Sequence, residues 1–245
     1  MSYQKSLETD NGSDAVPYAL VRKNDNKPTE NSCVMGTTKM VKIWGRTDSS
    51  NVQKVLWCCG ELGIEFERLD WGGKYGGNDD KTYRQMNPNG LVPTIKDGDF
   101  ILWESNSVMR YLNAKYGAGK LLPATPEGLG NANRWMDWQL STFNSAIVPL
   151  FWNLIRTPPE KRDPKVVQAA LEKTAKAWQT VEDQLAKTRY LGGEEFSLGD
   201  IPLGVWAYRW FNLPTDRPDF PNISKWYERL TQRKPYQTHI MIPLS

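Results

Sequence analysis

The segment NPNGLVPTIKDGDFILWES occupies residues 87–105 and is the most informative part of the sequence. Two short apolar runs are joined at Asp97-Gly98, a dipeptide that accepts the positive φ angles of a tight hairpin at little cost. A Pro/Asn/Gly turn precedes the first run, and Glu104-Ser105 opens a stretch whose apolar residues recur at helical spacing. The segment therefore predicts two antiparallel strands followed directly by a helix.

Two details of this segment point to a ligand rather than to packing alone. Pro93 stands at a strand start, and an X-Pro bond is the one peptide bond at which cis geometry costs little, about 0.5–1 kcal/mol. A cis Val92-Pro93 bond would turn the N–H and C=O of Val92 outward as an edge for pairing. Glu104 and Ser105 would place a hydroxyl and free backbone amides at a helix N-terminus, where a carboxylate binds well. Together they favour a site for a small acidic peptide, and a hairpin that merely packs is the alternative.

The composition is that of an ordinary globular protein, with 24% charged and 39% hydrophobic residues among 245. A net charge of +3 is too small to argue for nucleic acid or a membrane surface as a partner. No apolar run approaches the ~20 residues of a membrane span. Three cysteines, two of them adjacent, form neither a disulfide framework nor a metal-ligand spacing, so we expect a cytoplasmic location and no metal. The single histidine, His239, disfavours a histidine-centred dyad or triad.

The sequence divides into four parts by composition and periodicity. Residues 1–38 are polar without a clear period, and we expect a flexible extension there. Residues 39–118 show strand and helix signals in the order β-α-β-α-β-β-α, which predicts a compact α/β domain. Residues 119–126 hold a Pro-rich linker, and residues 127–245 predict an all-helical domain. The predicted helices of that domain span 127–156, 164–188, 199–212 and 221–233.

Two polar stretches predict helix starts. The turn RTDSSN at residues 46–51 precedes an amphipathic helix whose apolar positions begin at Val52. Ser and Asn residues in such a turn most often serve only as caps. The stretch SLGD at residues 197–200 predicts a capping box for a buried helix.

Three motifs carry a family resemblance: R-x-x-S-x-N-V at residues 46–52, N-P-N-G-L-V-P at 87–93, and W-E-S-N at 103–106. In this order, over residues 40–245, the chain resembles the cytosolic glutathione transferases, and its motifs look like those of the serine-type, theta-like bacterial members. The resemblance implies a thioredoxin-like N-terminal domain (β-α-β-α-β-β-α) and an all-α C-terminal domain. It also implies glutathione as the co-substrate and a homodimer.

The resemblance implies a role for each matching residue in binding glutathione. Val92 would pair its backbone with the cysteinyl part of glutathione, with Pro93 as the cis proline. Glu104 and Ser105 would hold the γ-glutamyl end. Further candidates for contact with glutathione are Gln53 and Lys74.

In this family a Tyr, Ser or Cys near the start of the first helix faces the glutathione sulfur. Because neither Tyr nor Cys occurs in that turn of this chain, the Ser/Asn cluster must serve. From its place in the R-x-x-S-x-N-V pattern of the resemblance we assign the catalytic role to Ser49, with Ser50 and Asn51 as alternatives. Trp135 and Trp138 are the candidates for a hydrophobic substrate pocket.

Three functions follow as hypotheses. The first is a glutathione transferase that joins the glutathione thiolate to a small hydrophobic electrophile. The second is a glutathione-dependent reductase of disulfides or peroxides on the same scaffold. The third is a non-catalytic binding module, against which the intact glutathione motifs argue.

Overall fold

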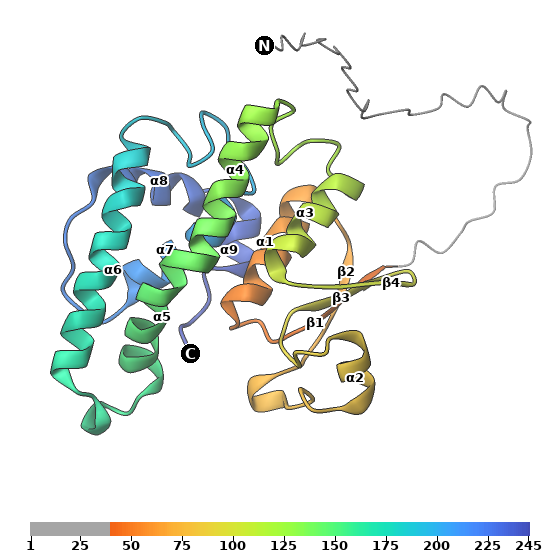
Figure 1. Ribbon diagram of the computed structural model, residues 1–245, viewed down its shortest axis with the longest axis horizontal. Coiled ribbons are helices and arrows are strands. Elements are labelled where there is room, and N and C mark those ends of the chain that lie inside the picture. Colours follow the sequence, from red (N-terminus) through yellow and green to blue (C-terminus); the bar gives the residue numbers. More distant parts are fainter. Residues whose placement is uncertain (1–39) are drawn as a thin grey trace, which may run out of the picture. The chain divides into compact units, whose positions relative to one another are not determined.

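The computed structural model describes residues 40–245, and Figure 1 shows their arrangement. The extension predicted for residues 1–38 lies outside the described residues. The first part of the chain forms a four-stranded mixed sheet of order β2-β1-β3-β4. Its strands are β1 (Val41–Trp44), β2 (Phe66–Leu69), β3 (Thr94–Asp97) and β4 (Phe100–Trp103).

The strand registers explain how the sheet is built. β1 pairs in parallel with β2, with Val41 opposite Phe66, because a crossover helix joins them. β1 pairs antiparallel with β3, with Ile43 opposite Ile95. β3 and β4 form the predicted hairpin, and Gly98 between them has φ +63°, which suits glycine. The hairpin prediction is confirmed.

The crossover helix α1 (Ser50–Leu62) and the helix α3 (Ser105–Tyr116) cover one face of this sheet (Figure 1). Their apolar sides meet those of the strands in a core from which water is excluded. The short helix α2 (Lys81–Met86) and the 3₁₀ turn Gly73–Tyr75 precede the hairpin. The core consists of Val41, Ile43, Val52, Val55, Leu56, Cys59, Ile95, Val108 and Leu112.

The second part of the chain is helical, as predicted. Its first predicted helix forms one run of α4 (Pro126–Trp138) and α5 (Asn144–Phe151), each followed by a π-helical turn, Gln139–Phe143 and Trp152–Arg156. The remaining helices are α6 (Pro164–Leu185), α7 (Asp200–Asn212), α8 (Pro221–Thr231) and α9 (Lys234–His239). No helix within residues 40–245 is long and apolar enough to cross a bilayer.

Helix α9 was not predicted, because six residues are too short to show a period and include Pro235. The proline is tolerated in the first turn, where its missing N–H has no helical partner to lose.

Helix α1 joins the two parts of the protein. The Glu61 carboxylate accepts two hydrogen bonds from Arg233, at 2.7 and 2.6 Å, and one from Trp57 Nε1 at 2.8 Å. Gly204 of α7 permits the contact with Trp57, since a Cβ there would lie 2.7 Å from the indole ring. These contacts fix α1 against the helical part, so a cavity that both parts line has a defined shape.

Candidate active site

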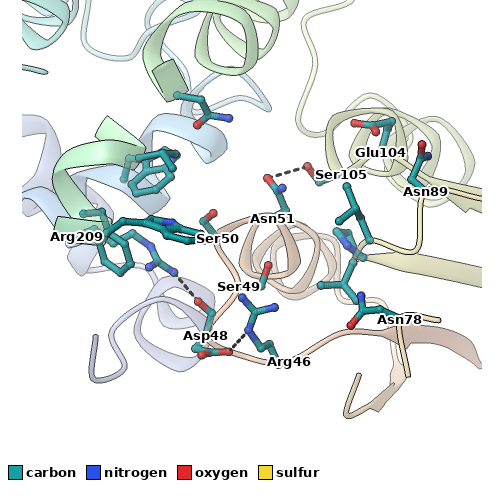
Figure 2. Close-up of a pocket in the computed structure, with 18 of the residues that line it drawn as sticks. Arg46, Asp48, Ser49, Ser50, Asn51, Asn78, Asn89, Glu104, Ser105 and Arg209 are labelled. Atoms are coloured by element: carbon teal, nitrogen blue, oxygen red, sulfur yellow. Dashed lines mark hydrogen bonds and ion pairs between the residues drawn. The ribbon is translucent and has the colours of Figure 1, made fainter. Parts of the chain in front are cut away.

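A cavity of about 350 Å³ lies between the start of α1, the turn at Val92-Pro93, the start of α3 and the helices of the second domain (Figure 2). The first domain supplies mainly polar groups to its wall. The second domain supplies the aromatic rings of Phe151, Trp152 and Trp206 and the side chains of two arginines. The polar half of the cavity therefore suits a peptide, and the aromatic half suits a second ligand with an apolar body. Seven residues predicted from sequence line it: Ser49, Ser50, Asn51, Val92, Pro93, Glu104 and Ser105.

Ser49 is the N-cap residue of α1, with extended backbone angles of φ −77° and ψ 122°. A serine that only caps would accept a hydrogen bond from an amide of the first helical turn. The Ser49 side chain makes no such bond, although it is only 8% exposed and faces the cavity. Its hydroxyl is therefore available to a ligand atom beside the N-terminus of a 13-residue helix.

The two alternatives for the role of Ser49 lie next to it on α1. Ser50 also lines the cavity. Asn51 Oδ1 accepts a hydrogen bond from Ser105 Oγ at 3.4 Å, so this amide already has a partner (Figure 2). That contact leaves Asn51 less available than the two serines.

The Val92-Pro93 peptide bond is cis, as predicted. Tyr83 holds the loop that leads to this bond, since its hydroxyl donates to the Leu91 carbonyl at 2.6 Å. Asn87 Nδ2 donates to the same carbonyl at 2.8 Å. Burial raises the pKa of Tyr83, so this phenol keeps its proton at neutral pH. The backbone of Val92 is thereby held at the wall of the cavity.

Glu104 combines an exposed carboxylate with an unusual backbone. Its angles are φ +70° and ψ 105°, a region that costs a residue with a Cβ about 1–3 kcal/mol. Its side chain does not cap α3. Together with Ser105, it lines the cavity at the N-terminus of that helix, and the exposed carboxylate of Glu104 is open to a ligand.

Lys54 of α1 is fully buried. Its ammonium donates to Gln139 Oε1 at 2.7 Å, a contact from α1 to the helical domain. Burial lowers the pKa of Lys54 to about 7, and the negative charge of Glu104 acts in the opposite direction. Lys54 therefore both bonds to the helical domain and interacts electrostatically with Glu104 of the site.

A Lys54→Met variant tests this assignment through the pH dependence of stability. Above about pH 7 the folded wild type binds fewer protons than its unfolded chain, in which lysine titrates near pH 10.4. The stability of the wild type relative to the variant should therefore rise by about 1 kcal/mol per pH unit between roughly pH 7 and 10. Urea unfolding of both proteins across this range measures the difference. A difference that stays constant with pH would contradict the lowered pKa.

Two arginines from the helical domain reach the cavity and were not predicted. Arg156 ends the π-helical turn after α5, and Arg209 belongs to α7. Arg209 donates to the Asp48 carbonyl at 2.9 Å and to Gln53 Oε1 at 2.7 Å. Burial lowers the pKa of Arg209 to about 10, and the nearby positive charge of Arg156 adds to this. One sequence signal existed, namely a lone basic residue within the otherwise apolar helix at residues 200–212.

Two of the predicted glutathione ligands do not line the cavity. Gln53 is buried, and its amide bridges Arg209 and the His239 carbonyl, the latter at 3.3 Å. It joins α1 to the second domain instead of facing a ligand. Lys74 lies in an exposed 3₁₀ turn, with its ammonium 5.1 Å from the centroid of the Tyr75 ring.

The predicted tryptophans also lie elsewhere. Trp135 and Trp138 line a separate hollow between α4 and α6, and their ring centroids are 5.5 Å apart. The side of α4 that carries them faces α6 rather than the cavity. The aromatic wall consists instead of Phe151, Trp152 and Trp206.

Comparisons with known proteins agree with this geometry. The profile of the glutathione S-transferase N-terminal domain matches residues 48–115, and that of the C-terminal domain matches residues 143–234. Glutathione S-transferase GstB of Escherichia coli K12 is 38% identical over 208 residues, which cover 84% of this chain and 100% of GstB. Glutathione S-transferase 3 of Zea mays is 30% identical over 216 residues, which cover 83% of this chain and 95% of the maize protein.

A solved glutathione S-transferase structure has the same fold as this chain. The theta class glutathione S-transferase of Xanthomonas axonopodis pv. citri, with glutathione bound, superposes with a TM-score of 0.81 at 45% identity. The match covers 84% of this chain and 99% of that one. From its two domain matches, its full-length relatives and the fold that they share, the chain belongs to the glutathione S-transferase family.

Proposed function

We propose that the protein conjugates glutathione, as the thiolate, to a small electrophile, and that the Ser49 hydroxyl stabilises the thiolate. The observation that carries the proposal is the Ser49 side chain, which lines the cavity without making a cap hydrogen bond. Glutathione as co-substrate is supported by the relative from Xanthomonas axonopodis, whose structure holds it.

The residues along the cavity suit the parts of glutathione in order. The backbone of Val92 pairs with the cysteinyl unit. The Glu104 carboxylate receives the ammonium of the γ-glutamyl unit, and Ser105 receives its carboxylate at the N-terminus of α3. This order leaves the sulfur at the start of α1, next to Ser49.

One hydroxyl is enough to activate the thiol. A free thiol has a pKa near 8.5, and lowering it to about 6.5 requires about 2.7 kcal/mol of preference for the anion. A hydrogen bond to a charged acceptor supplies about 1.5–3 kcal/mol, and a helix N-terminus adds about 0.3–1 kcal/mol. The thiolate then attacks the electrophilic carbon, the carbon–sulfur bond forms, and the leaving group departs with its electron pair.

The two cysteines of α1 do not suit a reaction through a protein thiol. Cys58 and Cys59 are buried, and burial raises the pKa of Cys59 to about 12. A reductase on this scaffold would have to use a second glutathione. Assays with chlorodinitrobenzene and with a small disulfide separate the two reactions, and conjugation without disulfide reduction is the result we expect. A homodimer and a cytoplasmic location stay predictions.

Glu104→Gln tests whether Glu104 binds the γ-glutamyl unit of glutathione. The amide has the size of the carboxylate but loses the charge that pairs with the ammonium, so KM for glutathione should rise about tenfold, more than kcat falls. Steady-state kinetics with varied glutathione measure both constants. Glu127→Gln, at the exposed start of α4, is the matched control. An unchanged KM in Glu104→Gln would remove Glu104 from the site.

A further inference from the structure

Three guanidinium groups line the part of the cavity that receives the second substrate. They belong to Arg46 before α1, Arg156 after α5 and Arg209 of α7. Figure 2 shows Arg46 and Arg209 on either side of Asp48, while Glu104 lies across the pocket. These positive charges thus gather on the side of Ser49 away from the γ-glutamyl seat.

Asp48 balances only part of this charge. Its Oδ1 lies 2.9 Å from Arg46 Nε, and its Oδ2 accepts a hydrogen bond from Ser245 Oγ at 2.9 Å. Among residues 40–245, neither Arg156 nor Arg209 forms an ion pair with a carboxylate. Arg156 Nη2 instead donates to the main-chain oxygen of Ser245 at 3.4 Å, and the negative charge of Asp48 acts on both Arg156 and Arg209. The single carboxylate of Asp48 is therefore shared among three guanidinium groups.

Arg209 gives an independent indication. Its side chain is almost fully buried, yet its Nε has no hydrogen-bond partner among the described residues. The charges also repel one another, since the pKa of Arg156 is lowered by burial and then by the positive charge of Arg46. An anion bound among the three would relieve this repulsion.

Aromatic rings accompany the arginines. The guanidinium of Arg156 lies 5.1 Å from the Trp152 ring centroid, and that of Arg209 lies 4.8 Å from the Phe151 centroid and 5.4 Å from that of Trp206. The rings can pack against a flat apolar body, and the guanidinium groups can bind a negative group at its end.

We infer that the second substrate is an anionic electrophile, a flat apolar body with a carboxylate or a similar acidic group that Arg156, Arg46 and Arg209 hold. This inference rests on the proposed function and specifies the class of its second substrate. Chlorodinitrobenzoate is a suitable probe, and chlorodinitrobenzene is its neutral counterpart. In either reaction the thiolate sulfur attacks the ring carbon that carries chlorine, the carbon–sulfur bond forms, and chloride leaves with the electron pair of the broken bond. The thiol proton goes to solvent.

The test compares kcat/KM for the two probes, each divided by its uncatalysed rate with glutathione. We expect the wild type to favour the benzoate, and Arg156→Gln to lower the benzoate-to-benzene ratio about tenfold. Arg156→Lys should restore part of the ratio, because it restores the charge. Arg189→Gln, which changes an exposed arginine that does not line the cavity, should leave the ratio unchanged. Added salt should raise KM for the benzoate more than for the neutral probe.

Four outcomes would overturn the inference. An equal loss with both probes and a raised thiol pKa would mean that Arg156 serves the thiolate. A rise only in KM for glutathione would mean that it holds a glutathione carboxylate. Conjugation of both probes with an unchanged ratio in Arg156→Gln would overturn the anionic substrate and leave the proposed function intact. Conjugation of neither probe would overturn both.

Discussion

Replacement of Ser49 by alanine should lower kcat/KM at about pH 6.5 by about 10- to 100-fold. The variant loses the hydroxyl that donates to the sulfur anion, so the thiol pKa returns toward about 8.5 and less thiolate is present. The loss should shrink as the pH rises, because glutathione then ionises without help. Glutathione affinity should change little, since the contacts of Val92, Glu104 and Ser105 remain. Kinetics with chlorodinitrobenzene across the pH range measure this profile.

Ser50→Ala is the matched control for this experiment. It removes a hydroxyl from the next residue of the same turn and from the same cavity wall. Its pH profile should follow that of the wild type. If Ser49→Ala keeps full activity at every pH, the role belongs to Ser50 or Asn51 instead.

Replacement of Asp200 by alanine should lower the free energy of unfolding by about 3–5 kcal/mol. The Asp200 side chain is fully buried at the start of α7. It accepts hydrogen bonds from the amides of Leu191 and Ser197, at 2.9 and 3.0 Å, and from Trp226 Nε1 at 3.0 Å. Ser197 Oγ is a fourth donor at 3.3 Å. Alanine would leave these buried donors without an acceptor, and each such group costs about 1–3 kcal/mol.

Equilibrium unfolding in urea measures this loss. Asp183→Ala removes an exposed carboxylate of α6 that accepts one hydrogen bond from Gln179, and it should cost less than about 0.5 kcal/mol. Equal stabilities of Asp200→Ala and Asp183→Ala would show that the buried network contributes nothing. The effect concerns stability rather than chemistry, because Asp200 does not line the cavity.

Those parts of the fold that depend on local signals could be predicted from sequence. Asp97-Gly98 defines the hairpin, and the polar turn before Val52 defines the start of α1. In the SLGD stretch, the Asp200 carboxylate accepts from the Ser197 amide, as in the predicted capping box. These features need only neighbouring residues.

Contacts between distant segments could not be predicted. Gln53 and Arg209 meet across 156 positions of sequence, and no local pattern shows that the amide of Gln53 is already used. The aromatic wall was misplaced for a related reason. The π-helical turn Gln139–Phe143 lies between Trp135 and Trp152, and it rotates the face that follows it relative to a regular α-helix. The side on which Trp135 lies therefore does not continue to Trp152.

The ultraviolet absorbance of the thiolate of bound glutathione, followed against pH in the wild-type protein, tests the central claim most directly. Calorimetry on the same sample establishes that glutathione is bound. We expect the bound thiol to have a pKa of about 6.5, well below the value of about 8.5 for the free thiol. Bound glutathione that titrates like the free thiol would contradict an activated nucleophile at Ser49.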